Sequence, residues 1–438
     1  MLGGGTVGSG VYHALQRNSQ LMASRLGVEV GLLKIAVKAF DEPRPYEIPR
    51  ELMTLDWQEV VRDPRVQVVI ELVGGTTIAR TMVLTALGLG KPVITANKAL
   101  LAAHGPELFA AASRHGANLY YEASVAGGIP IIKVVRESLV GNRFERIFGI
   151  VNGTCNYILT RMKREGADFS DVLKDAQRLG YAEAEPSLDV DGHDAAHKIG
   201  ILASLAHGFW IKQGDIHVEG IRAITKLDIQ FAGQLGYTIK LLGIVKRGAP
   251  AAKGRRSKAP NGSRVQVSVY PALVPNSHVL AGINDVYNAV FVRGDIVGDT
   301  LYYGRGAGKD ATASAVLSDV ADAALDLQHR SGNRVPPFVP HERNGAVLPI
   351  TESVSRYYVR LNVVDQAGVI ALVSAILGRA GISIASVIQP EGHEGEVVPL
   401  ILMMHAAPYA AMRKALATIG RLPVVKAPPM LIRVEDLA

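Results

Sequence analysis

The chain has 438 residues, of which 48% are hydrophobic and 20% charged, and its formal net charge is +7. This length predicts two or three domains, and the single cysteine, Cys155, excludes an intramolecular disulfide framework and is typical of a reducing compartment. The N-terminus lacks the pattern of a secretory signal, and no apolar stretch reaches the roughly 20 residues of a membrane span. We therefore expect a cytoplasmic protein without a membrane partner.

The first third of the chain alternates between β-rich runs and helical patterns. The expected helices cover residues 11–21, 78–89 and 106–115. The expected strands cover residues 34–37, 66–72, 93–95 and 119–121. This alternation predicts an α/β fold with a doubly wound, parallel Rossmann-type sheet over residues 1–123.

From about residue 145 the pattern changes. The stretch RIFGIVNGT is typical of a strand that runs into a helix, and residues 239–247 and 264–274 are expected to be long strands. They predict a second sheet, which we assign to an α+β substrate-binding and dimerisation domain over residues 124–299. Residues 300–327, with a helix from 311, are assigned to the nucleotide domain.

A proline-rich connector at residues 331–349 indicates a domain boundary, so we take residues 328–350 as a linker. Strands are expected at 356–364, 382–388, 397–404 and 430–434, and helices at 369–378 and 407–419. The resulting order β-α-β-β-α-β is that of a ferredoxin-like domain, here residues 351–438.

The positive charge is scattered along the chain. Its densest cluster lies between residues 247 and 264, in a stretch rich in Gly, Ala and Pro that is typical of a solvated loop. A nucleic-acid partner is therefore not expected. The cluster contains Lys253, Arg255, Arg256, Lys258 and Arg264.

A glycine loop opens the chain. Gly3, Gly5 and Gly8 form G-x-G-x-x-G before a helical pattern, the arrangement that brings a helix N-terminus close to a pyrophosphate. Only Met1 and Leu2 precede Gly3, so the strand that should lead into this loop is missing. Either the start is truncated, or the strand is absent and the sheet edge is incomplete, which would weaken cofactor binding and stability.

The end of the second strand normally carries the residue that reads the adenosine ribose. Here the sequence places Lys38 at the strand end and Asp41 just beyond it. Lys38 favours NADP, whereas Asp41 could equally serve the ribose of NAD. Both could also be solvated loop charges.

Two lysines have positions suited to chemistry. Lys98 follows the strand at 93–95, at the carboxyl edge where ligands of such sheets bind. Lys198 follows Asp194 by four residues and therefore shares a helix face with it, and the helix beyond is almost wholly apolar. Three more acidic residues, Glu183, Asp189 and Asp191, precede this pair. Two interpretations remain open: Lys198 transfers a proton in catalysis, or these charges form a solvated helix face.

Two further glycine-rich stretches follow strands. EASVAGGIP, from Glu122 to Pro130, offers one carboxylate and loop carbonyls to a hard cation, although a simple tight turn has the same sequence pattern. YGRGAGKDAT, from Tyr303 to Thr312, suits backbone contact with a ligand. Cys155 has no base at a readable spacing and is expected to be packed.

Taken together, these segments resemble the homoserine dehydrogenase family over about residues 1–325. The matching stretches, in family order, are GGGTVGSGV, TANKALLA, YYEASVAGGIPII, FGIVNGTCNYIL, GYAEAEPSLDVDGHDAAHKIGILA and YGRGAGKDATASAVLSDV. Residues 357–430 resemble an ACT domain through VVDQAGVIALVSAILGRAGISI. The arrangement is similar to the monofunctional form, in which no kinase segment precedes the dehydrogenase.

The resemblance implies a role for each matching residue. Lys198 would exchange a proton with the reacting oxygen, and Lys98 would lie between cofactor and substrate. The cofactor would be NADP or NAD, and the cation would be monovalent, usually sodium. The implied cofactor contacts are Gly5, Thr6, Val7, Gly8, Lys98, Gly180 and Gly306, to which the strand-end position adds Lys38. The implied substrate contacts are Glu183, Asp189 and Asp194. The implied cation ligands are Glu122 and the backbone of Val125, Gly127 and Ile129.

The implied activity is the interconversion of L-homoserine and L-aspartate 4-semialdehyde, in threonine, methionine and isoleucine biosynthesis. Another amino-acid or hydroxy-acid dehydrogenase, or a non-catalytic amino-acid sensor, remains an alternative. The ACT-like domain implies an amino-acid effector, with threonine expected, at the turn formed by residues 365–369. Because ACT domains usually pair, a homodimer or homotetramer is expected.

Overall fold

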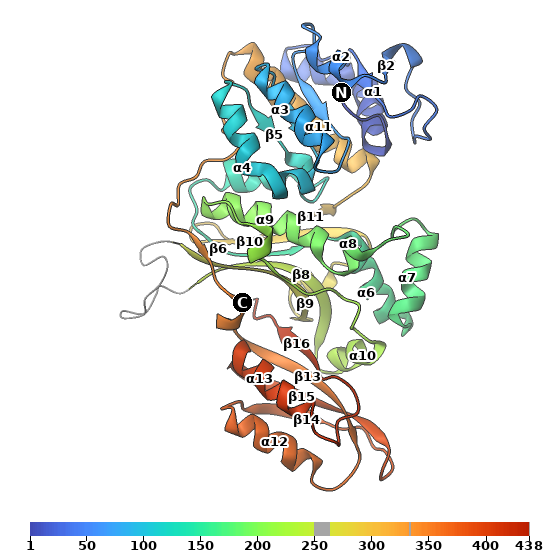
Figure 1. The fold of residues 1–438 in the computed structure, drawn as a ribbon, viewed down its shortest axis with the longest axis vertical. Coiled ribbons are helices and arrows are strands. Elements are labelled where there is room, and N and C mark those ends of the chain that lie inside the picture. The colour runs from blue at the N-terminus through green and yellow to red at the C-terminus, as the bar shows by residue number, and fades with distance from the viewer. Residues whose placement is uncertain (249–262, 333, 438) are drawn as a thin grey trace.

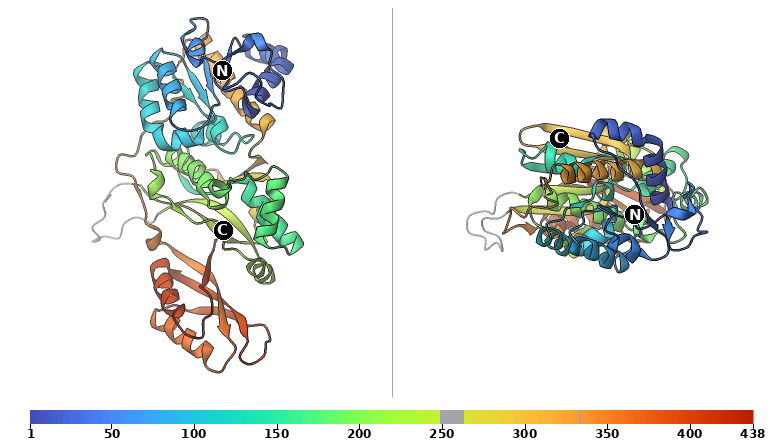
Figure 2. Two further views of the ribbon diagram at one scale, coloured as in Figure 1. Left: turned by 45° about the vertical axis from the view of Figure 1, so that its right-hand side comes forward. Right: turned by 90° about the horizontal axis from the view of Figure 1, so that it is seen from above.

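The computed structural model describes residues 1–248, 263–332 and 334–437. Lys253, Arg255, Arg256 and Lys258 of the basic cluster lie outside the described residues. The chain forms three bodies stacked along one long axis, with the N-terminal residues at one end and β13 to β16 at the other (Figures 1 and 2). Within the described ranges, no helix combines the length and apolar character needed to cross a membrane.

The N-terminal domain is a parallel sheet covered by helices. Its strands are β1 (Ile35–Ala36), β2 (Met53–Thr54), β3 (Val69–Glu71), β4 (Val93–Thr95) and β5 (Leu119–Tyr120). Its helices are α1 (Thr6–Leu26), α2 (Trp57–Arg62), α3 (Ile78–Gly88), α4 (Lys98–Arg114) and α11 (Lys309–Gln328), the last of which returns to pack against α1. The predicted parallel arrangement is confirmed.

Helix α4 begins eight residues earlier than the sequence pattern predicted. The side chain of Asn97 accepts a hydrogen bond from the N–H of Leu100 (3.1 Å) and so caps the helix at Lys98. The predicted start at Pro106 was wrong because a proline within the helix was taken as its beginning. The correction puts Lys98 in the first helical turn.

Leu2 lies in the middle of this sheet and not at its edge. It bridges Ala36 of β1 and Glu71 of β3 in parallel register. Its N–H donates to the carbonyl of Ile70 (2.7 Å), and its carbonyl accepts from Leu72 (2.8 Å). The expectation of an incomplete sheet edge is therefore corrected: the short strand position lies at the centre of the sheet, between β1 and β3. The glycine loop still leaves the sheet at its carboxyl end.

A cavity of about 350 Å³ continues the line of Leu2 toward the other end of the sheet. It is lined by Met1, by helix residues such as Val11 and Leu15, and by residues 28–34 and 65–68. The amino group of Met1 borders it and donates to the carbonyl of Lys34 (2.7 Å). Burial lowers the pKa of this amino group to about 5.

The middle domain is a mixed sheet with α9 (His193–His207) on the side that faces the N-terminal domain and α10 (Lys226–Gln234) toward the C-terminal domain (Figure 1). Its strands are β6 (Phe144–Ile150), β7 (His217–Val218), β8 (Tyr237–Arg247), β9 (Arg264–Pro275), β10 (Tyr287–Gly294) and β11 (Gly298–Arg305). Its other helices are α5 (Ile131–Lys133), α6 (Gly153–Glu165), α7 (Phe169–Arg178) and α8 (Ser187–Val190). Helix α9 packs on β8 and β9 from one side and on α4 from the other (Figure 1).

The C-terminal domain has the predicted β-α-β-β-α-β order. Its elements are β13 (Val354–Val364), α12 (Val369–Arg379), β14 (Ile384–Ile388), β15 (Val397–Pro408), α13 (Tyr409–Ile419) and β16 (Met430–Val434). The spatial order β16-β13-β15-β14, with antiparallel pairs, is ferredoxin-like. Strand β16 also pairs with β9 in parallel, so one sheet runs through the middle and C-terminal domains.

The proline-rich connector packs against the N-terminal and middle domains, which are the two upper domains in Figure 1. The ring of Phe338 lies against those of Phe109 and Trp210 (centroids 5.6 Å apart in each case), and the Tyr121 hydroxyl donates to the carbonyl of Pro337. The short strand β12 (Ala346–Val347) then pairs with β9. The segment thus follows the surface of the first two domains before it enters the third.

Candidate active site

The two lysines singled out in the sequence meet at one carboxylate. Lys98 opens α4 and Lys198 lies on α9, and these helices pack against each other between the two upper domains. The Nζ of Lys98 lies 3.0 Å from one carboxylate oxygen of Asp194, and the Nζ of Lys198 lies 2.8 Å from the other. The Asp194–Lys198 pairing predicted from the four-residue spacing is confirmed.

The core of this cluster is buried, whereas the side chain of Lys98 is 34% exposed. Asp194 is 4% exposed and Lys198 is 8% exposed. Burial by itself raises the pKa of Asp194, but the positive charges of Lys198 and Lys98 outweigh it and hold that pKa well below its usual range. The Nζ of Lys198 also donates to the carbonyl of Val151 (2.7 Å), which fixes its position.

Asn152 completes the cluster and was missed by the sequence reasoning. It caps α6 by accepting from the N–H of Cys155 (2.8 Å), and its amide donates to Asp189 (2.7 Å) and Asp194 (2.8 Å). An asparagine between a strand and a helix is a recognisable N-cap signal. Its second role follows only from the fold, which brings residues 152, 189 and 194 together.

The arrangement can stabilise an oxygen that becomes negatively charged. Two ammonium groups share a single carboxylate, so the cluster of Lys98, Lys198 and Asp194 has a net positive charge beside a largely buried ion pair. Preorganised positive charge of this kind favours a developing alkoxide. Lys198 can also give up or take a proton at that oxygen.

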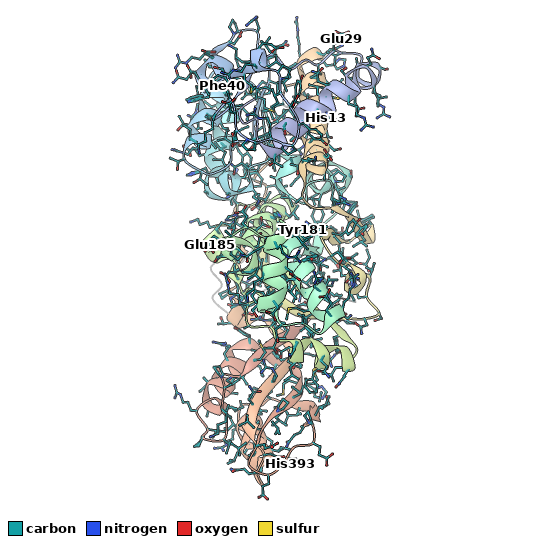
Figure 3. All side chains as sticks on the ribbon, turned by 90° about the vertical axis from the view of Figure 1, so that its right-hand side faces the viewer. His13, Glu29, Phe40, Tyr181, Glu185 and His393 are labelled. Atoms are coloured by element: carbon teal, nitrogen blue, oxygen red, sulfur yellow. The ribbon has the colours of Figure 1, made fainter. Side chains whose placement is uncertain are left out.

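The loop with Gly180 and Glu183 is not brought into the cluster. It connects α7 and α8 and is exposed, as Figure 3 shows for its labelled residues Tyr181 and Glu185. Within the described residues, Glu183 itself makes one hydrogen bond, in which its backbone carbonyl accepts from the Gln177 amide (3.0 Å). Of the acidic run, the fold therefore brings Asp189 and Asp194 together and leaves Glu183 on the surface.

The glycine loop has the geometry of an anion site. Helix α1 begins at Thr6, and Gly5 offers no side-chain cap to the N–H groups of the first turn, which includes Val7 and Gly8. A Cβ on Gly8 would collide with the carbonyl of Gly3, whereas a Cβ on Gly5 would meet no atom within 4 Å. The tight turn and the open space above Gly5 fit a phosphate at a helix N-terminus.

Lys38 lies in the exposed stretch after β1, as does Asp41. The sequence reasoning missed two arginines that gather at the same end of the strand. The guanidinium of Arg44 donates to the carbonyls of Ala39 (3.1 Å) and Phe40 (2.9 Å), and that of Arg50 lies 3.2 Å from the centre of the Phe40 ring. The same stretch also carries the carboxylates of Asp41, Glu42, Glu47 and Glu51, so cations and anions are mixed beyond β1.

Glu122 is buried at the bottom of its glycine-rich loop. Its two carboxylate oxygens accept from the N–H groups of Ile132 (2.9 Å) and Lys133 (2.8 Å). Burial nevertheless raises its pKa to about 7. No metal-binding group of three or more His, Cys, Asp or Glu residues occurs within the residues that the structure describes.

The loop that follows Glu122 packs against the loop of Gly306. The N–H of Gly128 donates to the carbonyl of Arg305 (3.0 Å), and a Cβ on Gly127 would lie 2.6 Å from the Gly306 carbonyl. Gly306 has no room for a side chain, because a Cβ there would collide with Asn288. Val125 and Ile129 are also buried, so all four predicted cation ligands lie in the segment 122–129 that packs against the Gly306 loop.

Comparisons with known proteins indicate one family. The family model described as homoserine dehydrogenase matches residues 130–321, and the model of the homoserine dehydrogenase NAD-binding domain matches residues 3–122. The homoserine dehydrogenase of Pseudomonas aeruginosa is 42% identical over 99% of this chain and 97% of its own length. That of Synechocystis is 43% identical over 99% of this chain and 98% of its own length.

Solved structures give the same result. A homoserine dehydrogenase from Thiobacillus denitrificans aligns with a TM-score of 0.90 and 41% identity, covering 100% of this chain and 97% of its own. The Staphylococcus aureus enzyme aligns with a TM-score of 0.75 and 33% identity, covering 100% and 98%. These relatives are similar over the full length, and family models match both upper domains. The chain therefore belongs to the homoserine dehydrogenase family, whose members are oxidoreductases with an NAD-binding domain.

Proposed function

We propose that this chain interconverts L-homoserine and L-aspartate 4-semialdehyde with a nicotinamide cofactor, in threonine, methionine and isoleucine biosynthesis. The observation that carries the proposal is the cluster of Lys98, Asp194 and Lys198, which lies between the helices of the nucleotide and middle domains. The family membership supports the same reaction.

In this proposal the bound cofactor exchanges a hydride with the substrate carbon. Lys198 holds the reacting oxygen and transfers its proton, and Lys98 adds a second positive charge beside it. Asp194 orients both lysines, and Asn152 orients Asp194 and Asp189. Asp189 binds the amino-acid part of the substrate, and Glu183 contributes a carboxylate when its exposed loop closes over the site.

For the cofactor we favour NADP. An archaeal homoserine dehydrogenase, 27% identical over 74% of this chain, has been solved in complex with NADPH, with a TM-score of 0.59. Lys38 is exposed directly after β1, at the position that contacts the adenosine ribose in such domains, and its ammonium group suits a 2′-phosphate. The pyrophosphate would lie at Gly5 to Gly8, and the remaining cofactor contacts would come from Gly180 and Gly306.

A monovalent cation, sodium by preference, is proposed at Glu122 with the backbone carbonyls of Val125, Gly127 and Ile129. The chemistry of the donor set fits, because a buried carboxylate and backbone carbonyls are hard oxygen donors. A cation there would also offset the burial that raises the pKa of Glu122.

The C-terminal domain is proposed to be an ACT domain that binds an amino-acid effector, threonine by expectation, near residues 365–369. Its ferredoxin-like order supports this assignment. We further propose domain bounds of 1–123 with 300–327, 124–299 and 351–438, with 328–350 as linker. A homodimer or homotetramer in the cytoplasm is proposed for the assembly.

The proposal is tested by measuring the reduction of NADP and NAD by the full chain. L-homoserine is compared with a panel of other amino and hydroxy acids, each with and without threonine. Homoserine should be the preferred substrate, and Glu183→Gln should raise the KM for homoserine more than the KM for the cofactor. Equal or faster reduction with another substrate would overturn the assignment.

A further inference from the structure

A buried arginine joins the C-terminal domain to the middle domain. Arg433 of β16 is 1% exposed, and its guanidinium carbon lies 4.2 Å from the centre of the Tyr270 ring and 4.4 Å from that of Tyr409. It donates to both carboxylate oxygens of Glu219, over 2.9 Å and 3.0 Å. A bidentate, stacked arginine of this kind holds its partner in one orientation.

Glu219 belongs to the middle domain, directly after β7. Its carboxylate also lies 2.6 Å from the Nε2 of His217. Burial by itself raises the pKa of Glu219, but the hydrogen bonds from His217 and Arg433 lower it to about 2. The backbone N–H of Glu219 donates to the carbonyl of Val269 in β9 (2.8 Å). The backbone of Glu219 is thus fixed within the middle domain, and its side chain binds the C-terminal domain.

The residues after Glu219 hold a turn of the candidate active site. The N–H of Ile221 donates to the carbonyl of Val190 (2.8 Å), and a Cβ on Gly220 would collide with that same carbonyl. Arg222 donates to both carboxylate oxygens of Asp191, over 2.5 Å and 3.2 Å. Residues 219–222 therefore clamp residues 190–192, which we call the substrate turn.

The substrate turn separates Asp189 from Asp194, the two carboxylates that Asn152 joins. A cavity of about 310 Å³ lies between the turn and residues 430–432 of β16. Across this space, Glu219 links the strand to the turn through its ion pair with Arg433, beside a second route through β9, which pairs with β16. A shift of Arg433 would therefore reach Asp189 and Asp194 through residues 219–222.

We infer that Arg433 is a positioning residue for the substrate site: through Glu219 it sets the geometry of the substrate turn and with it the affinity for the amino-acid substrate. Movement of β16 then changes substrate affinity, which gives the C-terminal domain a direct path to the active site. This inference deepens the proposed function and rests on it.

A second ion pair between the same two domains provides a matched control. Arg360 of β13 donates to Asp228 of α10 over 2.7 Å and 3.0 Å, and both residues are buried. Asp228 accepts from Tyr358 and from the capping residue Thr225 and makes no hydrogen bond to the substrate turn among the described residues. Loss of Arg360 should weaken domain attachment without moving Asp189 or Asp194.

The experiment compares Arg433→Gln, Glu219→Gln, their double variant and Arg360→Gln in the full chain. We measure kcat, the KM for homoserine, the KM for NADP and the melting temperature. Arg433→Gln and Glu219→Gln should each raise the KM for homoserine about tenfold, with the cofactor KM changed less than about twofold. The double variant should resemble either single one, because both remove the same link.

Arg360→Gln should lower the melting temperature to a similar degree and leave the homoserine KM unchanged. If Arg433→Gln does not fold, Arg433→Lys, which keeps the charge and loses the bidentate geometry, should raise that KM about threefold. An unchanged homoserine KM in the Arg433 variant, or an equal rise in Arg360→Gln, would overturn the inference. A wild-type chain that does not oxidise homoserine would instead overturn the proposed function.

Discussion

The cavity beside Leu2 makes stability sensitive to what is joined to Met1. The carbonyl of Ile70 accepts from Leu2, and that of Lys34 accepts from the Met1 amino group. The N–H and C=O of one strand residue point to the same side, so the N–H groups of Ile70 and Lys34 also face the strand position that Met1 and Leu2 occupy. An extended segment ahead of Met1 would continue the central strand between Leu32 and Val68 and would enter the cavity.

The structure sets the size of the effect. Two added apolar residues would gain about 4 kcal/mol by burial and about 4 kcal/mol from four backbone hydrogen bonds. Ordering them would cost about 5 kcal/mol. The buried amino group of Met1, with its pKa lowered from 8.0 to about 5, costs a further ~1.4 kcal/mol at pH 7, which any extension removes. The net stabilisation is about 4 kcal/mol, equivalent to a rise in Tm of roughly 8–16 °C for the N-terminal domain.

The assay is thermal unfolding of chains with a six-residue extension that ends in Val-Ile or in Ser-Ser. The folded amino group has a lowered pKa, so its cost is absent above its ordinary pKa and grows as pH falls toward about 5. The Ser-Ser extension should therefore stabilise at about pH 6 and have little effect at about pH 9, whereas Val-Ile should stabilise at both. Equal effects of the two extensions at high pH would refute the strand geometry.

Three further predictions concern the ligand sites. The pKa of Glu122 rises from 4.5 to about 7 on folding, so the free energy of unfolding should fall by up to about 3 kcal/mol as pH rises through that range. Near pH 8, sodium chloride in place of choline chloride should restore this stability. An equal response of Glu122→Gln to sodium would count against a cation there. Gly5→Ala should leave the Tm of the cofactor-free chain unchanged and should weaken NADPH binding at least tenfold in a fluorescence titration. Gly8→Ala should lower that Tm. Equal losses of Tm in the two variants would contradict the open space above Gly5. Lys38→Ala should reduce the ratio of kcat/KM for NADP to that for NAD about tenfold, and an unchanged ratio would move phosphate recognition to Arg44.

Local patterns predicted most of the elements, because hydrophobic periodicity and strand-forming runs are properties of neighbouring residues. The boundaries of β4 and β16 agree with the prediction, and the four-residue spacing of Asp194 and Lys198 correctly predicts their contact. The start of α4 was missed because Asn97 acts as a cap, which competes with the helix-starting signal of Pro106.

Contacts between distant segments could not be predicted in this way. Lys98 and Asp194 meet only because α4 packs on α9, and Asn152 joins them from a third element. Leu2 could be placed at the centre of the sheet only from its bridges to both neighbouring strands. Glu183 shares the acidic run with Asp194, yet the loop between α7 and α8 keeps it at the surface.

The central claim is that Lys198, held by Asp194, transfers the proton in a homoserine dehydrogenase reaction. Its most direct test is the turnover of homoserine with NADP by the wild-type chain and by Lys198→Ala, together with NADPH affinity measured in the same samples. We predict that the variant loses about a thousandfold or more in kcat and keeps its affinity for NADPH within about twofold. Near-normal turnover by Lys198→Ala would contradict the account.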